Sequence, residues 1–172
     1  MTKTLTILLI FFSTICFGQG SNSDLLKDNH ELTFVNLVSF QDVFDGFYIC
    51  NGFCSDIFHL DSNMTFQKTR GCDIGGRSTI DSGLWRIENN LIIIESKKET
   101  LNFCVIKFDK YYFFLLQDQR QKFVADFQLA KKQVTNFKWL KSGDPDFTSN
   151  DLIQASLSNR YYVKELADST GT

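Results

Sequence analysis

Short apolar runs separated by turn residues recur from Gly46 onward and set the pattern of the chain. Asn51-Gly52 and Asp61-Ser62-Asn63 are typical of the residues between the runs. Because long helical crossovers are missing, the pattern predicts an all-β fold, an antiparallel meander of about eight strands in a sandwich or barrel. The runs predicted to be strands are Phe47–Cys50, Phe53–Leu60, Met64–Lys68, Ile80–Ile87, Leu91–Ser96, Leu101–Phe108, Tyr111–Leu116 and Phe123–Phe127.

The stretch from Gly83 to Glu95 is predicted to be the central hairpin of this meander. Asn89-Asn90 separates its two apolar runs, and asparagine tolerates the positive φ that a tight hairpin turn requires. Side chains alternate along a strand, so Trp85 and Ile87 are expected on one face of the first run. A single hairpin is only marginally stable in water, so this one is expected to lie within a larger sheet.

The segments on either side of the meander have mixed spacing. Residues 32–44 fit an amphipathic helix or a strand, and residues 128–140 fit a strand pair or a helix. Thr148 and Asp151 have the spacing of a capping box, which predicts a short helix through Leu157. Tyr161-Tyr162-Val163 is expected to form a last short strand or a lid.

Residues 1–18 have the pattern of a signal peptide. Lys3 precedes an apolar run from Leu5 to Phe12, and small residues follow before Gln19. A membrane helix and a buried strand are the alternatives, but the run is too short to cross a bilayer. A lipoprotein anchor at Cys16 is less favoured, because lipoprotein signals generally have a small residue before the cysteine and this chain has Ile15 there. The mature protein is therefore expected to be secreted or periplasmic.

Length and charge limit the remaining possibilities. About 150 residues follow the leader, enough for one domain with a real core. We divide them into a lead-in segment (19–45), a single barrel domain with a C-terminal helix (46–165) and a tail (166–172). A net charge of −2 gives no basic footprint, which argues against nucleic acid as a partner. No second apolar stretch is long enough to cross a membrane, so no transmembrane segment is expected in the mature chain. The 18 phenylalanines suggest an interior filled by rings or a cavity lined by them.

Four cysteines remain after the leader is removed: Cys50, Cys54, Cys72 and Cys104. An even number in an exported chain predicts two disulfides. Sequence alone does not fix the pairing; we favour Cys54 with Cys72, because the turn at 61–63 brings them together, and then Cys50 with Cys104. A zinc site is the alternative, but the spacing lacks paired knuckles.

Other candidate chemistry is weak. Asp144, Asp146, Thr148, Asn150 and Asp151 are spaced like the first half of a calcium loop, but Ser149 and Ala155 stand where glycine and glutamate belong. A turn and helix cap explain the same residues. The loop from Gly71 to Gly76 is better explained by a neighbouring disulfide than by anion binding. His59 has no catalytic signature around it, so we predict no catalytic residue, no metal and no cofactor, and an enzyme is the least favoured class.

Two short motifs carry a family resemblance. Gly46-Phe47-Tyr48 after a lead-in segment, and Gly83-Leu84-Trp85, resemble the pattern of the lipocalin-like (calycin) barrels, over roughly Gly46 to Leu140. The resemblance implies a lipocalin-like barrel of eight strands, here with short N- and C-terminal helical segments, whose interior can hold one small apolar molecule.

Two functions follow as hypotheses. The first is a non-enzymatic exported protein that binds a small apolar ligand inside the barrel. The residues expected to line that cavity are Phe58, Leu60, Phe66, Trp85, Ile87, Phe103, Phe113 and Phe123. The second is an exported interaction module or inhibitor with a filled barrel, which binds another exported protein through loops such as Gly71 to Gly76. The two differ in whether aromatic side chains fill the interior.

Overall fold

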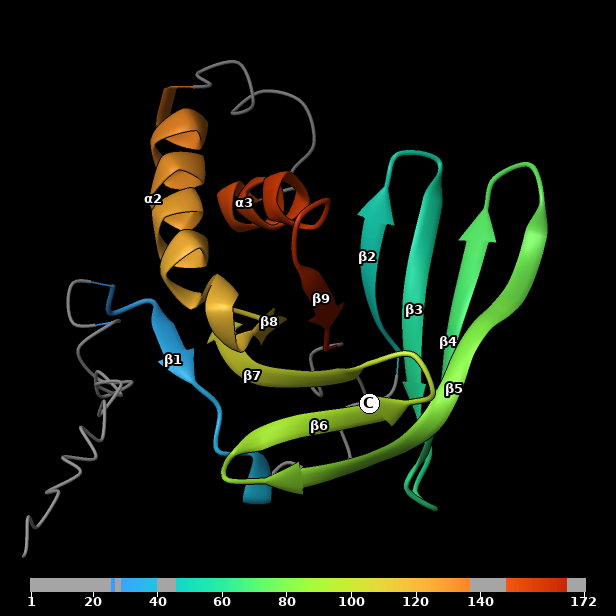
Figure 1. Cartoon of the computed structure of the whole chain (residues 1–172). Coiled ribbons are helices and arrows are strands. Elements are labelled where there is room, and N and C mark those ends of the chain that lie inside the picture. The colour runs from blue at the N-terminus through green and yellow to red at the C-terminus, as the bar shows by residue number, and fades with distance from the viewer. Residues whose placement is uncertain (1–25, 27–28, 40–45, 137–147, 167–172) are drawn as a thin grey trace, which may run out of the picture.

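In the part of the chain that the structure describes, eight antiparallel strands close into a barrel and a ninth lies beside it (Figure 1). The computed structural model describes residues 26, 29–39, 46–136 and 148–166. The barrel order is β2-β3-β4-β5-β6-β7-β8-β9, with β9 pairing back to β2. The strands are β1 (Leu32–Phe34), β2 (Phe47–Asn51), β3 (Cys54–Leu60), β4 (Thr65–Cys72), β5 (Gly76–Glu88), β6 (Leu91–Ser96), β7 (Thr100–Phe108), β8 (Tyr111–Leu116) and β9 (Tyr162–Glu165).

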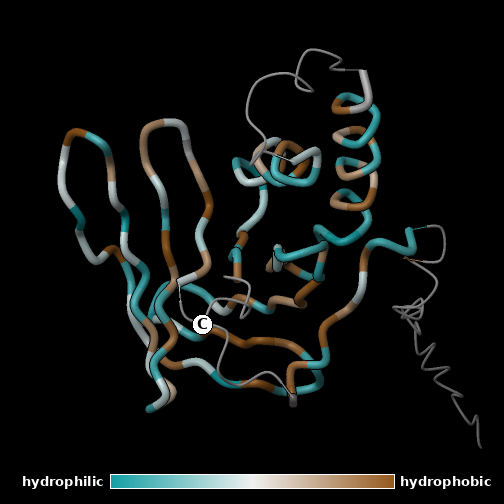
Figure 2. Tube along the Cα trace, turned by 180° about the vertical axis from the view of Figure 1, so that it is seen from behind, coloured by the Kyte–Doolittle hydropathy of each residue, from teal (hydrophilic) through white to brown (hydrophobic). Residues whose placement is uncertain are grey.

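Seven of the eight predicted strands are confirmed as β2 to β8, and the prediction for Phe123–Phe127 is wrong. Those residues lie in the helix α2 (Arg120–Asn136), which follows the short 3-10 turn η2 (Gln117–Gln119). Phe123, Phe127 and Ala130 are all buried, at the spacing of one helix face. Figure 2 shows apolar and polar colours alternating around the turns of this helix. The ambiguous segment from residue 128 is therefore helix as far as Asn136.

The eighth barrel strand comes from the end of the chain. Thr148 caps the helix α3 (Ser149–Leu157) in the predicted capping box with Asp151, and β9 follows. Strand β9 pairs with β8 over four residues and with β2 at Tyr48 and Val163. The prediction of a last short strand is confirmed, and this strand closes the barrel.

The predicted lead-in segment contributes to the fold. Strand β1 pairs with β7, and the 3-10 turn η1 (Leu37–Ser39) follows. The backbone N–H of Leu37 donates to Asn90 Oδ1 (2.8 Å), and Asn90 Nδ2 donates to the carbonyl of Val35 (3.0 Å). Asn89 and Asn90 have the predicted positive φ, 52° and 59°. The turn of the central hairpin therefore also holds the lead-in segment, whose Val35 and Leu37 are buried in the same core as the barrel interior.

Side chains on the two faces of the barrel wall form two cores. One core lies inside the barrel and contains Phe47, Phe58 and Phe114. The other lies outside, where α2 and α3 cover β7, β8 and β9, and contains Phe113 and Phe127 (Figure 1). Strand β8 is apolar on both faces because it has a core on each side, as its sequence predicted.

Gly83 lies where two neighbouring strands leave no room for a side chain. A Cβ at this position would be 2.9 Å from Phe66 Cε1 and closer still to the carbonyl oxygen of Glu95. We expect Gly83→Ala to lower the free energy of unfolding by about 2 kcal/mol, because backbone cannot move aside cheaply. Gly71→Ala is the matched control, since its nearest atom is Arg77 Nε at 3.7 Å. Urea denaturation of both variants measures this, and equal stabilities would refute the crowding argument.

Candidate functional site

The barrel interior holds most of the side chains predicted to line a cavity. Phe58, Leu60, Phe66, Trp85 and Phe103 are buried there, and Ile87 packs partly against them. Phe113 and Phe123 are elsewhere, and their assignment is wrong: both belong to the outer core. Phe113 faces outward because it alternates with the inward Phe114 along β8. Phe123 lies on α2, outside the barrel wall.

Aromatic rings meet one another across the interior. The Phe47 ring stacks on Phe114 with centroids 4.1 Å apart and on Phe58 at 5.0 Å. It meets Phe103 and Tyr162 edge-on, each at 5.7 Å. These separations are those of rings in direct contact. Phe47 is fully buried and therefore joins rings from four other strands.

Two hairpin tips lie side by side at one end of the barrel, the β2–β3 turn and the β4–β5 turn (Figure 1). The disulfide Cys54–Cys72 joins them, and the backbone N–H of Asp73 donates to the carbonyl of Phe53 (3.1 Å). Phe53 is 80% exposed and Ile74 is 96% exposed. Figure 2 shows apolar colour at the β4–β5 tip. A covalently fixed tip therefore presents two large apolar side chains to solvent. We call it the hairpin tip (residues 51–54 and 72–76).

Inward-facing charges lie directly below this tip. Asp56 is opposite Arg70 in the β3–β4 ladder, and Phe58 is opposite Lys68. Arg70 Nε and Nη2 donate to the two Asp56 oxygens at 2.6 and 2.9 Å. These hydrogen bonds, helped by the charges of Arg70 and Lys68, outweigh burial and lower the pKa of Asp56. The barrel mouth under the hairpin tip is therefore polar, above an aromatic interior.

Comparison with protein-family models, with curated proteins and with solved structures found no match to this chain. No helix among the described residues is long and apolar enough to cross a membrane.

The disulfide prediction is half right. The Cys54–Cys72 bridge is confirmed and fits an oxidising compartment, but Cys50 and Cys104 are free. Strands β9 and β8 lie between β2 and β7 around the barrel, so these two cysteines are roughly three strand spacings, about 14 Å, apart. That is too far for a disulfide. Because Cys54 and Cys72 are bonded to each other, a four-cysteine zinc site is wrong too.

We expect thiol titration to find two reactive classes. Cys50 is partly exposed, whereas Cys104 is buried on the outer face of β7. Burial raises the pKa of Cys104, although Arg120 Nε donates to its sulfur at 3.1 Å and opposes this. In a protein that starts at Gln19, a thiol reagent should label one cysteine in the folded state and two after unfolding. If the reagent labels no cysteine in the unfolded, unreduced protein, Cys50 and Cys104 form a disulfide after all.

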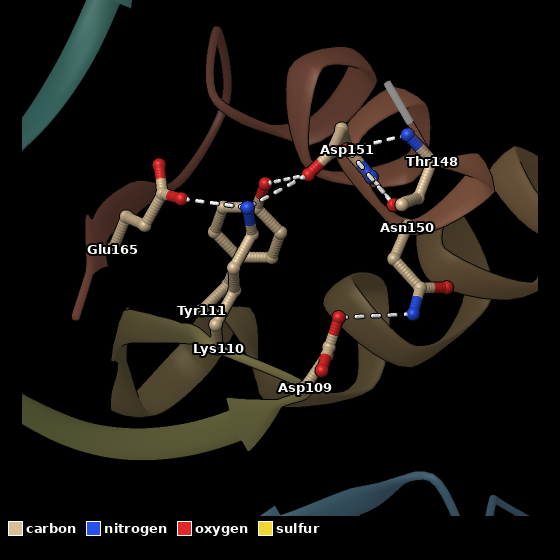
Figure 3. A network of polar contacts seen from close by, with 7 residues as sticks. All are labelled: Asp109, Lys110, Tyr111, Thr148, Asn150, Asp151 and Glu165. Atoms are coloured by element: carbon tan, nitrogen blue, oxygen red, sulfur yellow. Dashed lines mark hydrogen bonds and ion pairs between the residues drawn. The ribbon is translucent and has the colours of Figure 1, made fainter. Parts of the chain in front are cut away.

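A polar network fixes the start of α3 against the β7–β8 turn (Figure 3). Tyr111 Oη donates to Asp151 Oδ1, and Lys110 Nζ lies 3.2 Å from the same oxygen. The backbone N–H and the hydroxyl of Thr148 donate to Asp151 Oδ2 at 2.6 and 2.8 Å. Lys110 also pairs with Glu165 at 2.8 Å. Both carboxylate oxygens of Asp151 are engaged within the fold, so this network is a structural clip.

The clip also explains the described part of the calcium-like spacing. Asp144 and Asp146 lie outside the described residues, as does Cys16. Among the described residues, no group of three or more His, Cys, Asp or Glu side chains could hold a metal ion. His59 Nε2 lies 3.4 Å from Thr69 Oγ1 on a half-buried strand.

Sequence reasoning missed the charged mouth, although a signal for it was present. If Cys54 and Cys72 are opposite each other, antiparallel register places Asp56 opposite Arg70 and Phe58 opposite Lys68. Residues two apart share a face, so these charges had to share a face with the disulfide and with Phe58. The favoured bridge was therefore enough to predict them.

Proposed function

We propose that this chain is an exported interaction module with a filled barrel, and that it binds a partner protein through the hairpin tip. The ring contacts around Phe47 are the main support for this proposal. Rings in direct contact occupy the interior with the protein's own side chains, which leaves little space there for a ligand. A lipocalin-like origin of the barrel is part of the same proposal. Two observations support it. The barrel has eight antiparallel strands, and the tryptophan of the Gly83-Leu84-Trp85 motif is buried.

The hairpin tip has the features of a binding anchor. A partner would bury much of the apolar surface of Phe53 and Ile74. Burial of apolar surface contributes about 25 cal/mol per Å² to the binding free energy, before the cost of association. The disulfide and the Asp73–Phe53 hydrogen bond fix their backbone in advance, so little ordering remains to be done on binding. The partner should present an apolar pocket to this end of the barrel.

Paired variants test the tip. In a crosslinking pull-down from the exported fraction, the wild type and Leu129→Ser should capture the same protein. Leu129 is another exposed large apolar side chain, at 50%, but it lies on α2. The double variant Phe53→Ser/Ile74→Ser should capture at least about tenfold less of that protein. This is the loss expected when two side chains each contribute more than about 1 kcal/mol to binding. Equal capture by both variants would exclude the tip as the binding surface.

Native mass spectrometry separates this proposal from the small-ligand hypothesis. An unaltered polypeptide mass is expected for the purified protein if its barrel is filled. A co-purified apolar molecule that survives in the Phe53→Ser/Ile74→Ser variant would instead support binding of a small apolar ligand in the interior. That outcome would exclude the filled-barrel proposal.

A further inference from the structure

Lys68 is a partly buried cation without a close carboxylate partner among the described residues. Its side chain is 17% exposed, and its Nζ lies over the Phe58 ring, 5.0 Å from the centroid. The nearest carboxylate oxygen is Asp56 Oδ2 at 3.8 Å, beyond hydrogen-bond distance. Asp81 is opposite Lys68 in the ladder, but its Oδ1 accepts from the N–H of Ser82 instead. Among the described residues, Lys68 Nζ therefore has no hydrogen-bond acceptor.

The neighbouring side chain of Tyr162 carries a second donor, its hydroxyl. The Tyr162 ring contacts Phe58 at 5.2 Å and Phe103 at 5.7 Å, and Lys68 Nζ lies 5.9 Å from its centroid. No residue in the described ranges accepts a hydrogen bond from its hydroxyl. Burial, with the negative charges of Asp56 and Glu99, raises the pKa of Tyr162, so the hydroxyl keeps its proton at neutral pH.

The hydrogen-bond donors at this point, rather than the net charge, suit a small monoanion. Lys68 and Arg70 carry two positive charges, and Asp56 neutralises one of them through its bidentate bond to Arg70. Lys68 has no such bond, and the neighbouring Tyr162 hydroxyl offers a second donor. The negative charges of Asp81, which is opposite Lys68, and of Glu99, which acts on Tyr162, offset the Lys68 charge. They disfavour a dianion such as phosphate. An ammonium and a hydroxyl match the two oxygens of a carboxylate.

We propose that Lys68 and Tyr162 form a carboxylate-binding site in the barrel mouth, on the Phe58 ring. A carboxylate held there would accept hydrogen bonds from both donors in place of water, above the buried Phe58 ring. The carboxylate has two possible sources, a free organic acid or an acidic side chain of a partner protein. The site is independent of the proposed binding through Phe53 and Ile74.

Titration with two probes tests the site. Sodium benzoate and an amidated peptide with one glutamate are each titrated into the wild-type protein at constant ionic strength, with chloride as the balancing anion. NMR shifts of the Tyr162 and Lys68 side chains report binding. Saturable shifts with either probe support the site. Tighter binding of benzoate assigns it to a free acid, and tighter binding of the peptide assigns it to a partner. No saturable shift with either probe refutes the proposal.

Single substitutions then identify the donors. Lys68→Met should weaken binding of the better probe at least about tenfold, and Tyr162→Phe by about tenfold, the usual effect of losing a hydrogen bond to a charged group. Lys107→Met is the matched control, because Lys107 also lies over a tyrosine, Tyr112, at 5.7 Å on β7 and β8. Unchanged affinity in both Lys68→Met and Tyr162→Phe, with far-UV spectra like the wild type, would overturn the assignment.

Discussion

Phe47→Ala is expected to lower the free energy of unfolding by about 4 kcal/mol, the middle of the usual range for a buried phenylalanine. Phe47 is fully buried and contacts the rings of Phe58, Phe103, Phe114 and Tyr162. Its removal takes away apolar contact on several sides at once, and the barrel wall, hydrogen bonded all round, cannot collapse to fill the space. Urea denaturation, with the slope checked against the wild type, gives the difference.

Phe53→Ala is the control for this experiment. Phe53 is the same residue type six positions along the same hairpin, but it is 80% exposed. Its replacement should change the stability by less than about 0.5 kcal/mol. A loss below 1 kcal/mol in Phe47→Ala would mean that the interior is loosely packed, and the small-ligand hypothesis would gain from that result.

The same variant also probes the volume of the interior. An apolar cavity of the size of a lost ring can bind benzene, as engineered cavities in other cores do. We expect benzene to raise the melting temperature of Phe47→Ala and to leave that of the wild type unchanged. If benzene stabilises the wild type equally, the native interior already has room for a guest.

The strands were predictable because alternation and turn residues are local signals. Asn89-Asn90 and Trp85 were placed correctly, since a two-residue turn and a period of two fix them without reference to the rest of the chain. Phe123–Phe127 was not, because two phenylalanines four apart fit a short strand as well as a helix face. Only the longer run of helix formers to Asn136 separates the two, and part of it was left ambiguous.

Long-range pairing was the part that local signals could not supply. Closure of the barrel by β9, after two helices, depends on Val163 pairing with Phe113 and Tyr48 from distant strands. The same holds for the false pairing of Cys50 with Cys104, which needed the order of strands around the barrel. By contrast, the charged mouth follows from one correct disulfide. Once Cys54 is opposite Cys72, the antiparallel register also places Asp56 opposite Arg70.

Asp151→Ala is expected to cost about 3 to 4 kcal/mol at pH 7, more than a lost helix cap alone. The change removes the cap of α3 and also leaves the buried Tyr111 hydroxyl without its acceptor. Lys110 loses one of its two carboxylate partners and keeps its pairing with Glu165. Because α3 leads directly into β9, loosening its start should also weaken the strand that closes the barrel. Asp118→Ala, which removes an exposed carboxylate from η2, should change the stability by less than about 0.5 kcal/mol.

The pH dependence of this difference tests whether the Asp151 charge is the cause. Burial opposes ionisation of Asp151, but the hydrogen bonds from Tyr111, Thr148 and Lys110 outweigh it and hold its pKa well below the ordinary 3.8. A carboxylate with a lowered pKa in the folded state stabilises the protein above its unfolded pKa, and this contribution is lost as the pH falls. The gap between wild type and Asp151→Ala should therefore narrow by about 1 kcal/mol between pH 5 and pH 3. A gap that stays constant over this range would mean that Asp151 acts only through its shape and not through its charge.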